Sequence, residues 1–152
     1  MDSKPPYSYR DDPAVPGLPD AGPIFFVDGD CALCSRWARI VARRDKAGIA
    51  RICPVQSPTG RAVIAHYGLD ADDPTTWLYL EDGKAFDGIP GIVAAGRRLG
   101  GWLRPLAAVL ARVPPGLGAW LYARMARNRY TLLGRADLCA LPDPEIRARL
   151  IR

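Results

Sequence analysis

This sequence contains few of the residues that define several large classes of protein. Among its 152 residues are four cysteines, one histidine and three phenylalanines. Four unevenly spaced cysteines are too few for a small secreted scaffold held together by disulfides. No run reaches the roughly 18 consecutive apolar residues that a membrane-spanning helix requires. With 49% hydrophobic residues, the chain is instead expected to fold as one domain around an ordinary core.

Signals for secretion and for nucleotide binding are also missing. The first twenty residues lack the apolar segment of a secretory signal and are rich in proline, aspartate and tyrosine. We therefore expect a flexible arm over residues 1–22 and a cytoplasmic location. No nucleotide-binding motif is present, so we expect no bound cofactor, and any redox reaction would use the protein's own side chains.

Positive charge is in excess, with a formal net charge of +5. The surplus arginines lie mainly in two predicted helical regions, residues 36–46 and 97–129. A basic surface can attract nucleic acid or acidic lipid. Because no nucleic-acid-binding motif accompanies the charge, we interpret these arginines as solvent-facing and expect no nucleic-acid partner. Residues 127–129 (RNR) leave two interpretations open, binding of an acidic group near the site or capping of a helix C-terminus.

The first half of the chain changes pattern from strand to helix and back. The unbroken apolar run at residues 23–28 predicts a buried strand. From Cys31 onward, apolar residues recur at spacings of three and four, which predicts an amphipathic helix ending with Gly48 at its C′ position. A second strand at residues 49–55, closed by Pro54, completes a parallel βαβ unit.

The middle of the chain predicts the rest of a small sheet. Residues 59–67 predict a second helix, and residues 74–88 predict two strands joined by a turn at residues 81–83. Residues 91–100 predict a third helix. The order β-α-β-α-β-β-α predicts an α/β protein with the three layers of a thioredoxin-like fold, formed by residues 23–137 and followed by a tail at 138–152.

Two further helices are predicted at residues 103–113 and 117–127, separated by a Pro-Pro-Gly break. Their apolar faces consist of Trp102, Leu106, Val109, Leu110, Leu117, Trp120, Leu121 and Met125. An apolar face usually packs on the protein's own core, so we expect a helical lid over the sheet or the site. Contact with a membrane surface is the alternative, because arginines flank the apolar residues.

The chemistry is predicted to reside in Cys31 and Cys34, which begin the first helix. A helix N-terminus presents unpaired N–H groups and a partial positive charge, both of which stabilise an anion. The pKa of Cys31 should therefore be lowered, which would make it the nucleophile. Cys34 follows about one turn later, where its sulfur can resolve a mixed disulfide on Cys31. Cys34 should be the more buried and less acidic of the two.

Two carboxylates and a glycine precede the pair. Asp30 is the candidate N-cap of the helix, and Gly29 gives the tight turn its backbone freedom. Asp28 has two possible roles. It is either a catalytic residue that takes the proton from Cys34, or a structural residue that holds the turn through backbone hydrogen bonds.

Residues 26–34 (FVDGDCALC) resemble the D-x-x-C-x-x-C signature of the DCC family of thiol-disulfide oxidoreductases. Residues 54–57 (PVQS), residues 127–130 (RNRY) and Gly134 extend the similarity, which runs from about residue 23 to residue 134. The resemblance implies a thioredoxin-like fold and an activity in thiol–disulfide exchange. It leaves the substrate open.

The resemblance also implies a substrate-docking surface beside the pair. Thioredoxin-like enzymes place a cis-proline opposite the two cysteines, at the start of a core strand. Pro74 is the candidate for that proline in this chain. Gly29 and Asp30 are expected to contact the substrate as well.

Metal binding is the chief chemical alternative. Together with the redox pair, Cys53 and Cys139 supply four thiolates, the ligand set of many structural zinc sites. Such sites usually combine two close pairs, whereas Cys53 lies in an apolar strand and Cys139 is far from it in the sequence. We therefore expect no metal and interpret Cys53 as a small buried apolar residue.

These observations predict a disulfide reductase or related oxidoreductase. Its substrate would be a disulfide-containing protein or a low-molecular-weight thiol, and an external dithiol or reductase would recycle the Cys31–Cys34 couple. A non-catalytic thioredoxin-like interaction module is the alternative function. In that case the pair would be structural, and the C-terminal helices would bind a partner.

Overall fold

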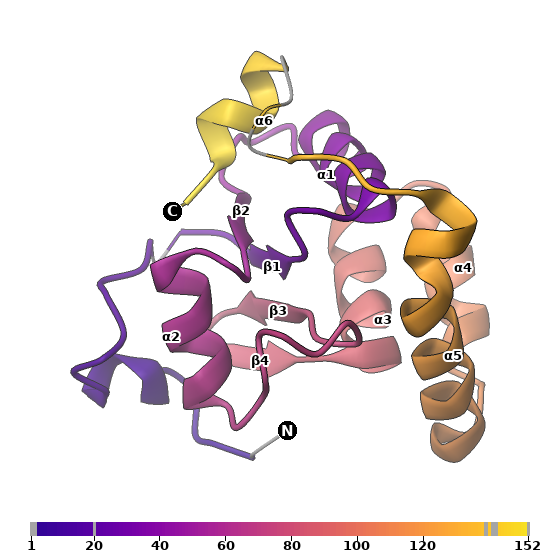
Figure 1. The fold of residues 1–152 in the computed structure, drawn as a ribbon, viewed down its shortest axis with the longest axis horizontal. Coiled ribbons are helices and arrows are strands. Elements are labelled where there is room, and N and C mark those ends of the chain that lie inside the picture. Colours follow the sequence, from indigo (N-terminus) through magenta and orange to yellow (C-terminus); the bar gives the residue numbers. More distant parts are fainter. Residues whose placement is uncertain (1–2, 20, 139, 141–142, 152) are drawn as a thin grey trace.

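The computed structural model contains a four-stranded sheet (Figure 1). It describes residues 3–19, 21–138, 140 and 143–151. The strands are β1 (Ile24–Val27), β2 (Arg51–Pro54), β3 (Leu78–Glu81) and β4 (Lys84–Phe86). The order across the sheet is β2-β1-β3-β4, with β1 parallel to β2 and the other neighbours antiparallel. This topology confirms the predicted α/β fold of thioredoxin-like type.

Six α-helices and one short 3₁₀-helix accompany the sheet in the described residues. They are η1 (Ser8–Asp11), α1 (Ala32–Arg44), α2 (Pro58–His66), α3 (Gly88–Leu99), α4 (Leu103–Leu110), α5 (Pro115–Leu133) and α6 (Pro144–Arg149). The prediction that Gly48 ends the first helix is wrong. That helix ends at Arg44 because Asp45 is its C-cap, and the Asp45 carboxylate accepts hydrogen bonds from the next loop's N–H groups.

The two faces of the sheet bury different helices. Side chains alternate along β1, so Phe25 and Val27 face one side while Ile24 and Phe26 face the other. The Phe25 side packs against α1, α3 and α6, and the Ile24 side packs against α2 (Figure 1). The three predicted layers are therefore present. The carboxyl end of β1 leads directly into α1, where the two cysteines lie.

The described part of the N-terminal arm packs on the α2 side. Tyr9 is 4% exposed and belongs to the core. The Tyr7 N–H donates to the Gly83 carbonyl at 2.9 Å. The only histidine, His66, binds Ser8 at 2.9 Å and Asp12 at 2.7 Å. These contacts attach the arm to α2 and to the β3–β4 turn, and the domain boundary at residue 22 stays a prediction.

The α4–α5 region differs from expectation. The inner side of α5 packs over the site, as predicted for a lid. However, seven of the eight residues predicted as packed apolar faces are exposed: Trp102, Leu106, Val109, Leu117, Trp120, Leu121 and Met125. In α4 the buried face is formed by Leu103 and Ala107 instead. No single helix in the described residues is long and apolar enough to cross a membrane. Together α4 and α5 meet that test, with a bend of 120°.

Candidate active site

The two cysteines lie at the start of α1 as predicted. Cys31 is the N-cap residue in extended backbone conformation, and Cys34 lies in the first turn of the helix. Both are free thiols. Cys31 is 0% exposed, whereas Cys34 is half-buried. By exposure, the predicted order of burial is therefore wrong, and residues 134–138, which follow α5, pair with the backbone at Cys31.

These covering residues pair with the loop that contains Cys31. Cys31 and Arg135 form an isolated antiparallel bridge. Three backbone hydrogen bonds hold the segment: Ala32 N–H to Gly134 O at 3.4 Å, Ala136 N–H to Asp30 O at 3.0 Å, and Leu138 N–H to Gly29 O at 2.7 Å. Leu138 is fully buried in the core and anchors the end of the segment. Cys31 thus lies beneath a short strand-like strap, residues 134–138.

The surroundings of Cys31 favour its thiolate. The Cys34 thiol donates a hydrogen bond to its sulfur, and this lowers the pKa of Cys31 to about 6. Burial opposes that shift, while the nearby backbone N–H groups of Cys34 and Leu33 and the charge of Arg129 support it. The same hydrogen bond, together with burial and the negative charge on Cys31, raises the pKa of Cys34. The pair is therefore divided into one thiolate and one thiol.

Asp28 is the centre of a hydrogen-bond network. Its carboxylate accepts from the Arg129 guanidinium, the Tyr130 hydroxyl, the Gln56 amide at 2.7 Å and the Asp30 N–H at 2.9 Å. Burial acts to raise the pKa of Asp28, but these donors outweigh burial and hold the pKa below its ordinary value. A carboxylate so stabilised is a weak base, and its bond to the Asp30 N–H holds the turn. This favours the structural role for Asp28 over proton acceptance from Cys34.

The other residues expected around the pair have mixed outcomes. The Gly29 N–H donates to Gln56 Oε1 at 3.0 Å, and a Cβ on Gly29 would lie 3.2 Å from the Pro54 ring. Asp30 is exposed and is not the N-cap, because the helix begins one residue later than predicted and Cys31 occupies that position.

The prediction of a cis-proline at Pro74 is wrong. No cis peptide bond occurs in the residues that the structure describes. Pro74 is exposed and precedes β3 by several residues in a turn. Thr76 and Trp77, which lead into β3, line the same cavity as Cys34. Pro74 therefore does not have the cis-proline geometry that was expected to dock the substrate backbone.

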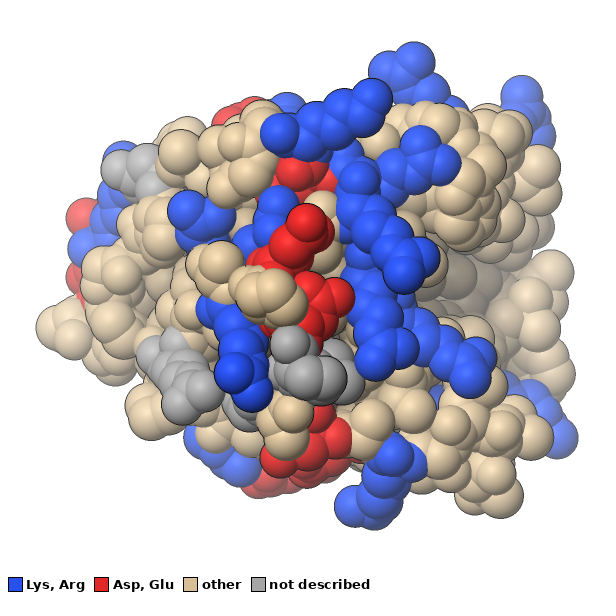
Figure 2. Space-filling view, turned by 90° about the horizontal axis from the view of Figure 1, so that it is seen from above, with Lys and Arg blue, Asp and Glu red and all other residues tan. Residues whose placement is uncertain are grey.

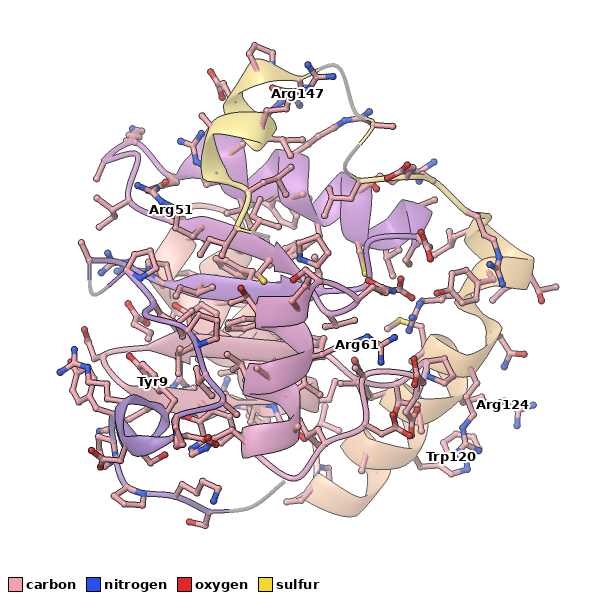
Figure 3. The ribbon with its side chains drawn as sticks, turned by 60° about the vertical axis from the view of Figure 1, so that its left-hand side comes forward. Tyr9, Arg51, Arg61, Trp120, Arg124 and Arg147 are labelled. Atoms are coloured by element: carbon pink, nitrogen blue, oxygen red, sulfur yellow. The ribbon has the colours of Figure 1, made fainter. Side chains whose placement is uncertain are left out.

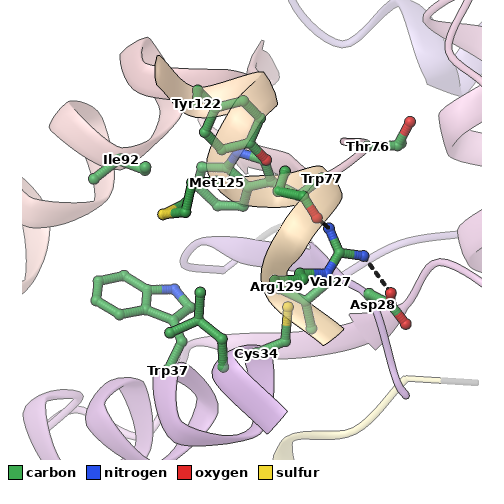
Figure 4. Close-up of a pocket in the computed structure, with 12 residues that line it drawn as sticks. Val27, Asp28, Cys34, Trp37, Thr76, Trp77, Ile92, Tyr122, Met125 and Arg129 are labelled. Atoms are coloured by element: carbon green, nitrogen blue, oxygen red, sulfur yellow. Dashed lines mark hydrogen bonds and ion pairs between the residues drawn. The ribbon is translucent and has the colours of Figure 1, made fainter. Parts of the chain in front are cut away.

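Beside Cys34 lies a small cavity of about 180 Å³ with mainly apolar walls (Figure 4). It is lined by Val27, Asp28, Leu33, Cys34, Trp37, Thr76, Trp77, Ile92, Tyr122, Met125, Ala126 and Arg129. The Tyr122 hydroxyl donates to the Thr75 carbonyl at 3.0 Å, which links α5 to the segment before β3. The cavity gives Cys34 an exposed side that Cys31 lacks.

Four partners of the site were not singled out as site residues from the sequence: Gln56, Tyr122, Arg129 and Tyr130. Of the two interpretations of residues 127–129, binding of an acidic group near the site is correct for Arg129. Its guanidinium contacts Asp28, which lies 101 positions earlier in the sequence. For Gln56, Arg129 and Tyr130 the sequence signal was the family resemblance at residues 54–57 and 127–130, and Tyr122 had none. Spacing alone cannot indicate a contact over such a separation.

The four-thiolate zinc site finds no support in the described residues. Cys53 is 0% exposed on the α2 side of the sheet, within hydrogen-bond range of Ser57 at 3.4 Å. Among the residues described, no group of three or more potential metal ligands occurs. Cys139 lies outside the described residues.

Comparisons with known proteins agree with the sequence resemblance. A family model for DCC1-like thiol-disulfide oxidoreductases matches residues 25–135. The uncharacterized protein YuxK of Bacillus subtilis is 29% identical over 128 residues, covering 84% of this chain and 93% of YuxK. The chloroplastic DCC family protein At1g52590 of Arabidopsis thaliana is 27% identical over 122 residues, covering 80% of this chain and 71% of that protein. No solved structure matches.

Proposed function

Because the chain belongs to the DCC1-like thiol-disulfide oxidoreductase family, we propose that it exchanges disulfides through a redox couple of Cys31 and Cys34. The substrate would be a disulfide-containing protein or a low-molecular-weight thiol in its disulfide form. The observation that carries this proposal is the asymmetry of the pair. The pKa of Cys31 is lowered to about 6 while that of Cys34 is raised, so a nucleophile and a proton-bearing resolving group stand one turn apart.

The reaction would proceed in two displacements. The Cys31 thiolate attacks one sulfur of the substrate disulfide and forms a mixed disulfide, and the other substrate sulfur leaves as a thiolate. Cys34 then loses its proton and attacks Cys31 Sγ, which expels the first substrate sulfur. The substrate gains two electrons from the pair, one proton from Cys34 and one proton from solvent, and the pair becomes a disulfide. An external dithiol or reductase would reduce it again.

The electrostatics of the site favour the second displacement. The anionic Cys31 is a main reason why the pKa of Cys34 is raised. That charge disappears when Cys31 enters the mixed disulfide, whereas the nearby Arg129 guanidinium remains and acts to lower the pKa of Cys34. Cys34 thus becomes more acidic at the step where its thiolate is needed. The role of Arg129 here is to lower the pKa of Cys34, and its ion pair with Asp28 holds the guanidinium in place.

Access to Cys31 requires movement of the strap. Cys31 is fully buried next to residues 134–138, and a substrate disulfide must reach its sulfur in line with the scissile bond. Separation of residues 134–136, with Leu138 left in the core, breaks the backbone hydrogen bonds at Ala32 and Ala136. Each such bond contributes a net stability of only about 1 kcal/mol. The free energy of local opening is therefore a small fraction of the free energy of global unfolding.

The proposal is tested by insulin reduction with dithiothreitol. We expect the wild-type protein to accelerate the reaction and Cys31→Ser to abolish the acceleration, because serine cannot form the mixed disulfide. Cys53→Ser is the matched control, since Cys53 lies on the other side of the sheet, and it should retain the wild-type rate. Equal rates for the wild type and Cys31→Ser would leave a non-catalytic interaction module as the better explanation.

A further inference from the structure

The large apolar side chains that the described residues expose are concentrated in one region. All nine with substantial exposure lie between residues 102 and 133, on α4, on α5 and beside them. On α4, Trp102, Leu106 and Val109 follow a spacing of four and three, which brings them to one side of the helix. Leu103 and Ala107 form the adjacent, buried side of α4. We call the exposed side chains of residues 102–133 the α4–α5 surface.

The same region carries charge of only one sign. Residues 88–136 contain eight arginines and no aspartate, glutamate or lysine. Arg98 and Arg129 pair with acidic residues of the sheet side, Glu81 and Asp28. Arg104, Arg112, Arg124 and Arg127 are exposed. In Figure 2 the right-hand part of the molecule, where α4 and α5 lie, shows blue among tan and no red.

Aromatic and basic groups are combined on this surface. The Arg124 guanidinium lies over the Trp120 ring, 5.6 Å from its centroid. Both side chains project outward from α5 (Figure 3), and Trp120 is 57% exposed. An indole beside a guanidinium suits the boundary between water and lipid, because its ring is apolar and its N–H is polar.

We propose that the α4–α5 surface binds a membrane surface that contains anionic lipid. Apolar side chains would enter the boundary between headgroups and acyl chains, while the exposed arginines contact lipid phosphates. Leu106 and Val109 are among the residues that would supply the apolar contribution. Arg104 and Arg112 are among those that would supply the electrostatic contribution. The protein would lie on the membrane, with its redox pair kept in the α/β body beside α5.

Other occupants fit the surface less well. A symmetric dimer through this surface would bring the same residues of two copies together, and so would set arginines against arginines without an acidic partner. Nucleic acid would match the charge. It would not cover leucine, valine and methionine side chains, since single strands bind by stacking on aromatic rings.

The test is flotation of the full chain with phospholipid vesicles. We expect the wild-type protein to float with vesicles containing phosphatidylglycerol, to stay unbound with pure phosphatidylcholine, and to be released by added salt. The triple variant Leu106→Ser, Val109→Ser and Trp120→Ser should bind about tenfold more weakly. All three positions are exposed, so circular dichroism should show an unchanged fold.

A second variant separates the charge contribution from net charge. Arg104→Gln, Arg112→Gln and Arg124→Gln should also reduce binding about tenfold. The control Arg39→Gln, Arg43→Gln and Lys84→Gln removes the same charge from exposed positions on α1 and β4, and it should bind like the wild type. Three outcomes would each overturn the proposal. The first is an equal loss of vesicle binding in the arginine variant and its control, and the second is a wild-type protein that does not float. The third is a concentration-dependent dimer that the apolar variant abolishes. None of these outcomes depends on redox activity.

Discussion

At the residue scale, the acidity of Cys31 depends on groups from two distant parts of the chain. The Cys34 thiol and the first-turn N–H groups belong to α1, while the Arg129 charge comes from α5. Asp28 holds that arginine with a buried ion pair. Removing Asp28 would leave Arg129 buried without its carboxylate, which is strongly destabilising in proteins. The acidity of Cys31 therefore depends on tertiary packing as well as on the helix start.

The first residue-scale prediction concerns the pH dependence of alkylation. The rate of iodoacetamide reaction at Cys31 should rise with pH around a midpoint of about 6, because the thiolate reacts and the pKa is lowered to that value. Cys34→Ala removes the largest contribution and should move the midpoint upward, toward the ordinary thiol value of 9.0. Peptide mass spectrometry after timed alkylation measures both. A wild-type midpoint near the ordinary value would contradict the prediction.

At the element scale, a short strap between α5 and α6 pairs with the loop that contains Cys31. Gly134 ends α5 with a φ of 81°, in the left-handed region, and so allows the chain to turn back over Cys31. The following residues bond to the loop between β1 and α1. The strap is therefore part of the site, although nothing in its own sequence pattern distinguishes it from a tail.

The second prediction addresses this strap. Ala136→Pro removes the N–H that donates to Asp30 O, and the lost bond should cost about 1 kcal/mol. Alkylation of Cys31 through local opening should then be about fivefold faster. Ala136→Ser keeps the N–H and is the matched control, with an expected rate like that of the wild type. Equal rates for Ala136→Pro and Ala136→Ser would show that the strap does not limit access.

At the scale of the whole molecule, the Cys31 thiolate links pH and stability. The pKa of Cys31 is lower in the folded protein, about 6, than its ordinary value of 9.0. Between these values the unfolded chain holds a proton that the folded protein has released, so stability increases with pH. Below about pH 6 the thiol is protonated in both states, and this contribution is lost.

The third prediction follows from that linkage. In urea unfolding, the reduced wild-type protein should gain up to about 4 kcal/mol between about pH 6 and pH 9 relative to Cys31→Ser. Below about pH 5 the difference between the two free energies of unfolding should stop changing with pH. A difference that does not change with pH would mean that Cys31 is not held as a thiolate.

Local pattern by itself determined much of the architecture. The apolar run before Asp28, the helical spacing after Cys31 and the Asp82-Gly83 turn correspond to β1, α1 and the β3–β4 hairpin. Each depends on neighbouring residues, because strand alternation, helix periodicity and turn geometry are local properties of the backbone. The position of Cys31 and Cys34 at a helix start follows for the same reason.

Only the tertiary structure decided what surrounds and covers these elements. The contact of Arg129 with Asp28, the strap over Cys31 and the exposure of Trp102 and Val109 all depend on how distant segments pack. Periodicity identifies the apolar side of a helix, but whether core, lipid or water meets that side depends on the three-dimensional arrangement. For the same reason a Cys-x-x-Cys spacing predicts a reactive pair without indicating which sulfur a substrate can reach.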